Sequence, residues 1–123
     1  MSASPSTAVA DVHRTLELGA ARILVPTGIH RGDVIDVRAL VEHPMATGLF
    51  RDPEGHPIPA HFINDVSVTY GDREVAHFVW TSGLSRDPFV EFPLVADGES
   101  PLTITWKDNK GGVFRQSVDI RFI

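Results

Sequence analysis

Six histidines are the side chains of this protein that most readily support metal chemistry. Neutral imidazoles are common protein ligands for zinc, iron and copper. Four of them fall in the middle of the sequence: His43, His56, His61 and His77. Their spacing matches no familiar ligand set, because no two histidines lie two residues apart and no His-Glu-x-x-His motif occurs. We therefore predict no metal site.

Hydroxyl and carboxylate side chains form no recognisable catalytic set either. The candidate nucleophiles lie in expected turns and lack the setting of a nucleophile elbow: Ser82, Ser85 and Ser100. The candidate acids and bases are scattered over turns and exposed strand positions: Asp33, Asp36, Asp65, Asp87 and Glu91. Gly111-Gly112 lacks the strand-to-helix context of a phosphate-binding loop and is typical of a hairpin turn. We expect no enzymatic activity and no cofactor.

Composition narrows the function further. The 123 residues suffice for one compact domain. Sixteen acidic against eleven basic residues leave a formal charge of −5, which repels a phosphate backbone, and no apolar run approaches the ~18 residues of a membrane span. The absence of cysteine excludes disulfides, thiolate metal sites and covalent sulfur chemistry on this chain. We expect binding to neither nucleic acid nor membrane.

From Arg22 onward the apolar residues alternate with period two, which is typical of half-buried antiparallel strands. The expected strands are Ile23–Val25, Val34–Val41, Phe62–Tyr70, Glu74–Trp80, Phe89–Leu94, Leu102–Lys107 and Phe114–Phe122, separated by turns rich in Gly and Asp. This rhythm predicts an all-β, immunoglobulin-like antiparallel sandwich of about seven strands over residues 21–123. Residues 1–20 are expected to be a flexible or weakly helical extension.

Large aromatic side chains on the inward strand phases are expected to fill the core: Phe78, Trp80, Phe92, Trp106, Phe114 and Phe122. On the third strand the alternation places Phe62 inward together with Val66, Val68 and Tyr70, and Ile63 outward. Phe50 and Phe62 flank a long loop, but packing is the favoured prediction for both.

That loop is the segment that the sandwich does not explain. The strand ending at Val41 stops at Pro44, and residues 50–60 form a connection about three times the usual length. Its prolines, Pro44, Pro53, Pro57 and Pro59, stiffen it. Four apolar side chains have no place in the alternation: Met45, Leu49, Phe50 and Ile58. Either the loop displays them to a partner, or it folds back and caps one end of the sandwich.

Several motifs, in order, resemble the SoxZ family from about Ala21 to the end. They are Arg22 to Pro26, Gly32 to Val37, His43-Pro44-Met45-Ala46-Thr47-Gly48, Asp52 to Pro59, Phe62-Ile63-Asn64 and the turn from Trp106 to Gly112. The His-Pro-Met-x-Thr-Gly block is the most distinctive. Ala46 stands where the family often carries Glu, and the first twenty residues have no counterpart in it.

The resemblance implies an immunoglobulin-like subunit that pairs with SoxY, whose cysteine on a mobile C-terminal arm carries sulfur during thiosulfate oxidation. It also implies a periplasmic protein, exported in complex with its signal-bearing partner and in indirect contact with other periplasmic Sox enzymes. The chain is then a non-catalytic scaffold, and its lack of cysteine spares the partner's cargo from thiol exchange. Self-association of the chain without its partner stays open.

The residues expected to form the SoxY interface are His43, Pro44, Met45, Thr47, Gly48, Leu49, Phe50 and Ile58. The alternative is a stand-alone immunoglobulin-like module that binds a small molecule or a glycan. A superoxide reductase on a similar sandwich is a third class, and it needs a cysteine ligand that this chain lacks.

Overall fold

The computed structural model describes residues 18–123, so most of the expected N-terminal extension lies outside the described residues. The described part contains seven strands and no helix. They are β1 (Ala21–Leu24), β2 (Val34–Val41), β3 (Ile63–Tyr70), β4 (Arg73–Val79), β5 (Phe89–Val95), β6 (Pro101–Asp108) and β7 (Val113–Asp119). Nothing in residues 18–123 is a helix long and apolar enough to span a membrane.

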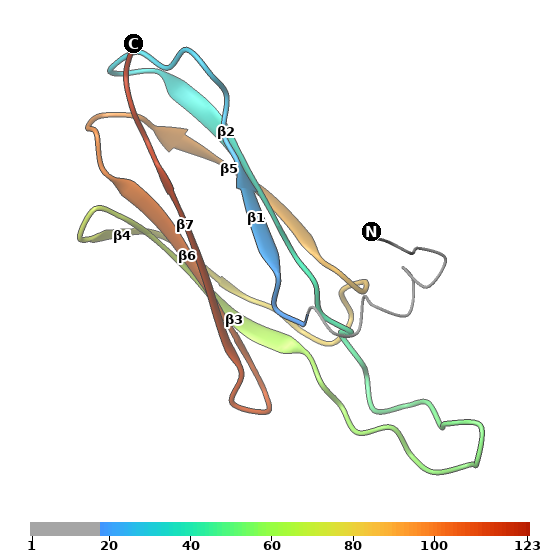
Figure 1. Ribbon diagram of the computed structural model, residues 1–123. Helices are drawn as coiled ribbons and strands as arrows, with labels where there is room; N and C mark the ends of the chain where they lie inside the picture. The colour runs from blue at the N-terminus through green and yellow to red at the C-terminus, as the bar shows by residue number, and fades with distance from the viewer. Residues whose placement is uncertain (1–17) are drawn as a thin grey trace, which may run out of the picture.

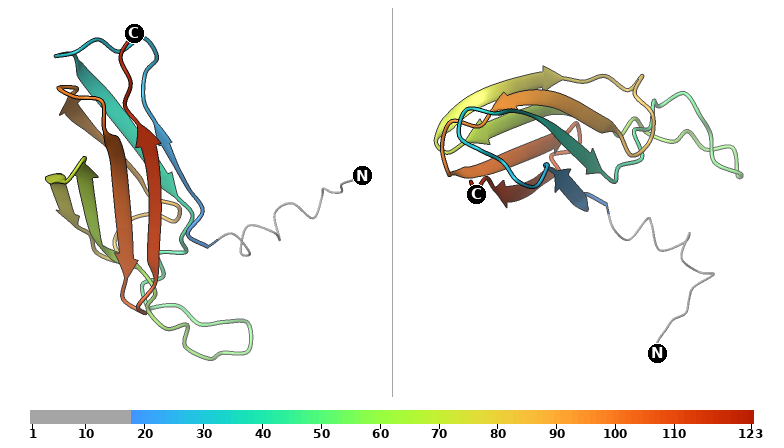
Figure 2. Two further views of the ribbon diagram at one scale, coloured as in Figure 1. Left: turned by 60° about the vertical axis from the view of Figure 1, so that its left-hand side comes forward. Right: turned by 90° about the horizontal axis from the view of Figure 1, so that it is seen from above.

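The strands form two antiparallel sheets that pack face to face (Figures 1 and 2). One sheet has the order β1-β2-β5, and the other has the order β4-β3-β6-β7. This is the predicted immunoglobulin-like sandwich. Strand β1 lies beside β7 and closes one flank, whereas on the other flank the backbones of β4 and β5 stay apart and only their side chains meet.

The core follows from the alternation along each strand. In β2 the side chains of Ile35, Val37, Ala39 and Val41 are buried and those between them are exposed, as predicted. Strand β6 buries Leu102, Ile104 and Trp106 in the same way. Of the six predicted core aromatics, Phe92 and Trp106 are fully buried, and the other four are partly buried against the same core.

The phase predicted for the beginning of β3 is wrong. Ile63, not Phe62, is fully buried, and Val66, Val68 and Tyr70 are buried as predicted. The β3–β6 pairing shifts register between Ile63 and Asp65, so one extra residue enters β3 at that point. Such a bulge inverts the inward and outward positions on its two sides.

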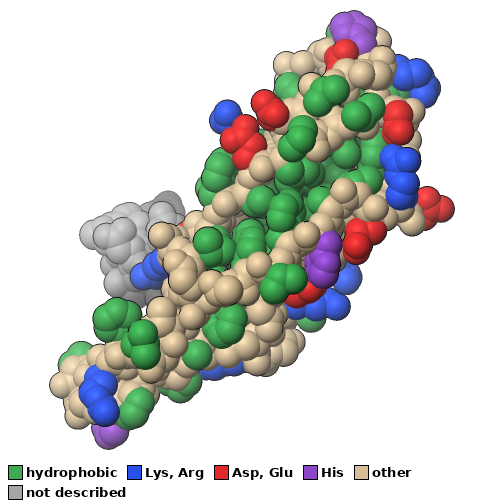
Figure 3. All heavy atoms as spheres, turned by 180° about the vertical axis from the view of Figure 1, so that it is seen from behind, with side chains coloured by type: hydrophobic (Ala, Val, Ile, Leu, Met, Phe, Trp, Pro, Cys, Tyr) green, Lys and Arg blue, Asp and Glu red, His purple; other side chains and the backbone are tan. Residues whose placement is uncertain are grey.

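The open flank between β4 and β5 exposes part of the apolar interior. Partly buried side chains of both strands line it, including Val75, Phe78 and Val90. Phe78 contacts the ring of Phe92 across the two sheets, with centroids 6.0 Å apart. Viewed from this side, hydrophobic side chains gather along the furrow between the sheets (Figure 3).

The long segment between β2 and β3 is an arm that projects from one end of the sandwich (Figure 1). We define the arm as residues 46–61. Ala46 and His61 pair at its base through two backbone hydrogen bonds of 2.7 and 2.9 Å, and Arg51 and Pro57 form a bridge further out. Pro53, Pro57 and Pro59 cannot donate, so the pairing between the two sides is sparse. The predicted loop is therefore a narrow antiparallel ribbon.

Gly48 allows the two sides of the arm to approach. Its φ of +86° lies in the left-handed region. A Cβ at this position would lie 3.2 Å from Cβ and 3.3 Å from N of Ala60 on the opposite side. The glycine of the His-Pro-Met-x-Thr-Gly block thus has a structural reason.

We expect Ile104→Ala to lower the free energy of unfolding by about 2–5 kcal/mol, because it removes three buried carbons from the centre of β6 and leaves a cavity. Urea unfolding followed by circular dichroism measures this. The matched control is Val34→Ala in β2, whose side chain is exposed, with an expected change below about 0.5 kcal/mol. Equal losses in both variants would contradict the core assignment.

Candidate functional site

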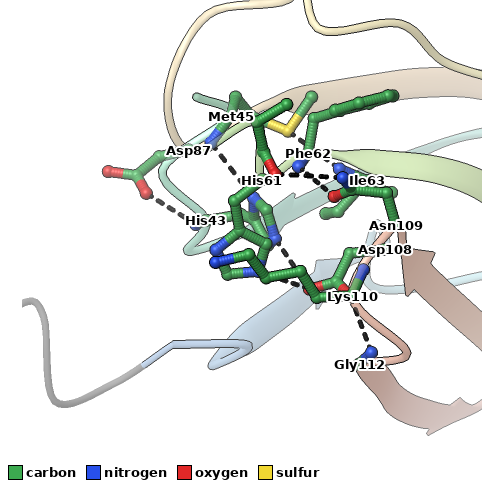
Figure 4. A network of polar contacts seen from close by, with 11 residues as sticks. His43, Met45, His61, Phe62, Ile63, Asp87, Asp108, Asn109, Lys110 and Gly112 are labelled. Atoms are coloured by element: carbon green, nitrogen blue, oxygen red, sulfur yellow. Dashed lines mark hydrogen bonds and ion pairs between the residues drawn. The ribbon is translucent and has the colours of Figure 1, made fainter. Parts of the chain in front are cut away.

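Three polar side chains meet where the arm joins the sandwich (Figure 4). His43 follows β2, His61 precedes β3, and Asp108 ends β6. His43 Nε2 lies 3.0 Å and His61 Nε2 lies 2.7 Å from the same carboxylate oxygen, Asp108 Oδ2. Both sides of the arm's base are therefore fixed to a single side chain of the neighbouring strand.

The hydrogen bonds of His43 define its tautomer. The backbone N–H of Met45 donates to His43 Nδ1 at 3.1 Å, so this nitrogen carries the lone pair. Nε2 then carries the proton and donates it to Asp108. The side chain is fully buried, and burial lowers its pKa below 6.5 despite the opposing hydrogen bond to Asp108. His43 is thus a neutral imidazole with both nitrogens engaged.

Asp108 accepts four hydrogen bonds. Oδ2 takes those of the two histidines, and Oδ1 takes the backbone N–H groups of Lys110 at 3.0 Å and Gly112 at 2.6 Å. Burial raises the pKa of a carboxyl group, but here the donors outweigh it and lower the pKa of Asp108 to about 2. The side chain is ionised at neutral pH, although almost no part of it reaches solvent.

The turn after Asp108 is shaped around this carboxylate. A Cβ on Gly112 would lie 2.7 Å from Asp108 Oδ2, so no larger residue fits without displacing the carboxylate. Asn109 fixes the second side of the arm's base: its Oδ1 accepts the N–H of Phe62 at 2.8 Å, and its Nδ2 donates to the carbonyl of Ala60 at 3.0 Å.

Met45 adopts the left-handed backbone conformation, with a φ of +49°. Such a conformation is unfavourable for a side-chain-bearing residue and persists only where neighbours hold it. Its N–H is bound by His43, and its buried Sδ accepts the N–H of Ile63 at 3.3 Å. The carboxylate of Asp87 accepts the N–H of His43 at 2.9 Å and secures the other side.

The predicted interface residues divide into a buried and an exposed group. His43 and Met45 are buried, so of the two alternatives left open for the loop Met45 follows the second, in which the loop folds back against the sandwich. Thr47 is partly buried, and the others are exposed: Pro44, Gly48, Leu49, Phe50 and Ile58. Leu49 is 84% and Phe50 68% exposed, so the packing predicted for Phe50 is wrong, because the arm carries it away from the core. Both earlier interpretations of the loop hold in part: its base caps the sandwich and its outer part is presented to solvent.

Histidine spacing did not indicate the convergence of His43 and His61, which the structure brings together. One ligand atom from each of His43, His61 and Asp108 lies within 4.8 Å of the others, and the same is true of Asp52, Glu54 and His56 near the arm's tip. Hydrogen bonds account for the first group, as described above. In the second, Asp52 Oδ1 accepts the backbone N–H groups of Glu54 and His56, which forms the turn at the tip. The sequence-based prediction of no metal site stays a prediction.

A small cavity of about 190 Å³ opens beside the two histidines. Its lining residues come from the chain before β1, the residues directly after β2, the end of the arm before β3 and the β4–β5 connection: Leu18, Glu42, His43, Pro44, His61, Arg86 and Asp87. The side chain of His61 is 17% exposed, whereas His43 is sealed. The cavity therefore gives solvent access to one of the two imidazoles.

Asp108 is the site residue that sequence analysis missed, since it was assigned to the turn. A signal was present: Asp108 continues the inward phase of Leu102, Ile104 and Trp106. A carboxylate in the buried phase of a strand needs partners, and histidine is a natural one.

Comparison with solved structures places the fold among small immunoglobulin-like sandwiches. The superoxide reductase (neelaredoxin) from Ignicoccus hospitalis superposes with a TM-score of 0.65 at 15% identity, covering 95% of this chain and 88% of that one. A variant of the Archaeoglobus fulgidus enzyme gives 0.61 at 18% identity, with coverages of 89% and 94%. The sulfur carrier protein SoxY from Chlorobium limicola f thiosulfatophilum gives 0.59 at 14% identity, with coverages of 94% and 96%. At these identities the likeness shows the fold alone.

The family follows from a match of the sequence to a family model. The model of the family described as Sulphur oxidation protein SoxZ matches residues 24–119. The chain therefore belongs to the SoxZ family, as its motifs suggested, and to the sulfur oxidation system. No curated protein sequence matches it.

We expect Asp108→Asn to lower the free energy of unfolding by about 2–4 kcal/mol. The asparagine side chain has the same shape as the aspartate, but whichever position its NH₂ group takes, this donor group lies opposite other N–H donors and cannot bond to them. His43 cannot accept from it, because Met45 already occupies Nδ1. Denaturant unfolding measures the loss. Asp119→Asn, at an exposed carboxylate, is the control and should change stability by less than about 0.5 kcal/mol. A neutral Asp108→Asn would show that the four donors are dispensable.

Stability should also depend on pH through His43. Because the pKa of His43 is lowered in the fold, the unfolded chain binds more protons than the folded chain below pH 6.5. The stability that neutral His43 contributes is therefore fully present above pH 6.5 and is lost as the pH falls through the pKa of the folded state. His77 has the opposite effect on the pH dependence of stability, since the hydrogen bond to Asp65 raises its pKa.

We therefore compare the stability of His77→Gln with that of the double variant His43→Gln/His77→Gln between pH 7.5 and 5.5. The single variant should lose stability on acidification more steeply. Parallel curves would contradict the assignment of His43 as neutral. The contribution of Asp108 to stability is lost only at lower pH, because its pKa falls from 3.8 to about 2 on folding.

Proposed function

We propose that this protein is the non-catalytic scaffold subunit of a SoxYZ-type carrier. Its partner is a SoxY-like subunit with a cysteine on a C-terminal arm, and sulfur intermediates stay bound to that cysteine during thiosulfate oxidation. The proposal includes a periplasmic location, reached in complex with a signal-bearing partner, and indirect contact with the other Sox enzymes. The SoxZ family match over residues 24–119 and the absence of cysteine support this role.

The observation that carries the proposal is the arm. Its base is fixed by Asp108, Asn109 and Asp87, yet its outer part exposes Leu49 and Phe50. Apolar side chains held out on an anchored segment lose little entropy on binding, which favours a partner surface. A stable interface with SoxY buries on the order of 1,600 Å² in total, so we infer that the arm contributes one part of a larger contact.

The alternative of a stand-alone glycan-binding module has less support. Among residues 18–123 the exposed large aromatic side chains are Phe50 in the arm and Phe89 at the start of β5. Neither tryptophan is exposed, and Tyr70 is buried. The described chain thus presents no row of exposed tryptophan or tyrosine on which a sugar ring would stack.

The test is copurification with a tagged SoxY subunit. We expect the double variant Leu49→Asp/Phe50→Asp to weaken the complex roughly 100-fold or more, because charged groups would enter an apolar contact. The melting temperature of the isolated chain should be unchanged, since both side chains are exposed.

The matched control is Ile123→Asp at the opposite end of the sandwich (Figure 1), where the side chain is 79% exposed. It should copurify like the wild type. Undiminished copurification of the double variant would remove the arm from the interface and leave the open flank between β4 and β5 as the apolar surface to test.

A further inference from the structure

The two histidines bound to Asp108 differ in their second ring nitrogen. In His43 this nitrogen accepts a hydrogen bond from Met45. In His61 the only hydrogen bond of the ring joins Nε2 to Asp108, and Nδ1 has no partner within residues 18–123. His61 also lines the cavity and is partly exposed. Since Asp108 is ionised and accepts from Nε2–H, the neutral ring carries its lone pair on Nδ1. The structure therefore holds an oriented imidazole with a free acceptor nitrogen beside a cavity.

We propose that His61 Nδ1 accepts the thiol proton of the partner's cysteine when the end of the partner's arm enters this cavity. The proposal rests on the function proposed above and adds one proton-accepting side chain to the scaffold, while the sulfur chemistry stays on the partner's cysteine. The S–H bond breaks and an N–H bond forms, which leaves a thiolate beside an imidazolium, and no electrons are transferred. A thiolate is the reactive form of cysteine, and a neighbouring histidine is a common means of generating it.

The size and lining of the cavity suit such a guest. Its volume of about 190 Å³ corresponds to roughly six water molecules at ~30 Å³ each, enough for a cysteine side chain and part of its backbone. Leu18 and Pro44 supply apolar wall. A thiol is itself a small, weakly polar group with one proton to donate.

The charged and titratable groups around His61 and its cavity come from several chain segments. They are Asp108 at Nε2, the edge-on ring of His43 at a centroid distance of 4.4 Å, and the cavity residues Glu42, Arg86 and Asp87. Arg86 is the cationic residue of the cavity lining, and a cation favours a thiolate over a thiol. Asp108 acts as a positioning residue: it fixes the tautomer and stabilises the imidazolium, as the carboxylate does in other Asp–His pairs.

The experiment measures the rate of thiol alkylation by iodoacetamide in the purified complex with SoxY, from pH 5.5 to 9. The variant is His61→Gln, which still offers Asp108 an N–H donor but has no basic nitrogen. His77→Gln is the control, because His77 is an exposed histidine that also pairs with a carboxylate, Asp65. We expect the His61→Gln complex to react about 10-fold more slowly at pH 7, with its midpoint displaced upward by about one pH unit. The His77→Gln complex should match the wild type.

The outcomes separate the two proposals. If wild-type chain and SoxY do not copurify, the scaffold function fails, and the thiol site fails with it. If the complex forms and His61→Gln has the same pH profile within twofold, only the thiol site is overturned. Long-range ¹⁵N–¹H NMR of the isolated chain gives a second test that needs no partner: His61 should carry its proton on Nε2, and a proton on Nδ1 with a bare Nε2 would overturn the inference.

Discussion

One buried carboxylate organises the end of the molecule that carries the arm. Asp108 gathers two imidazole N–H groups on one oxygen and two backbone N–H groups on the other. An ionised group this well shielded is tolerated only because four donors replace its hydration. The four donors come from both sides of the arm's base and from the β6–β7 turn, so a single side chain couples three chain segments that are remote in sequence.

This coupling explains how a ribbon with few hydrogen bonds of its own can project from a small sandwich. Beyond the base the two sides of the arm are held by a few backbone bonds, and three of its residues are prolines without a donor. The direction of the arm is therefore set at its base, by the left-handed backbone of Met45, the hydrogen bond from His43 N–H to Asp87 and the side-chain amide of Asn109. The buried half of the His-Pro-Met-x-Thr-Gly block serves this anchorage, and Leu49 and Phe50 directly after the block are exposed to solvent.

The sandwich could be predicted from the sequence because, in most strands, apolar and polar residues alternate and so indicate which side chains are buried. The inward phases of β2, β5 and β6 needed no information from other strands. The phase of Ile63 could not be read, because a bulge is defined by the partner strand and not by the residues within it. Likewise, His43 and His61 are 18 positions apart, and only the closed base of the arm brings them to one carboxylate. The exposure of Phe50 depends on the direction in which the arm leaves the sandwich, which local pattern does not encode.

The prolines of the arm have a consequence for how copies of the protein meet in solution. A two-stranded ribbon with exposed apolar side chains can pair edge to edge with a second copy, which is the route by which many β proteins form fibres. Pro53, Pro57 and Pro59 interrupt the row of N–H groups along its rims, so a second ribbon finds no continuous ladder to extend. The exposed apolar side chains at this end of the protein are therefore not accompanied by a continuous backbone edge to which a second copy could add a strand.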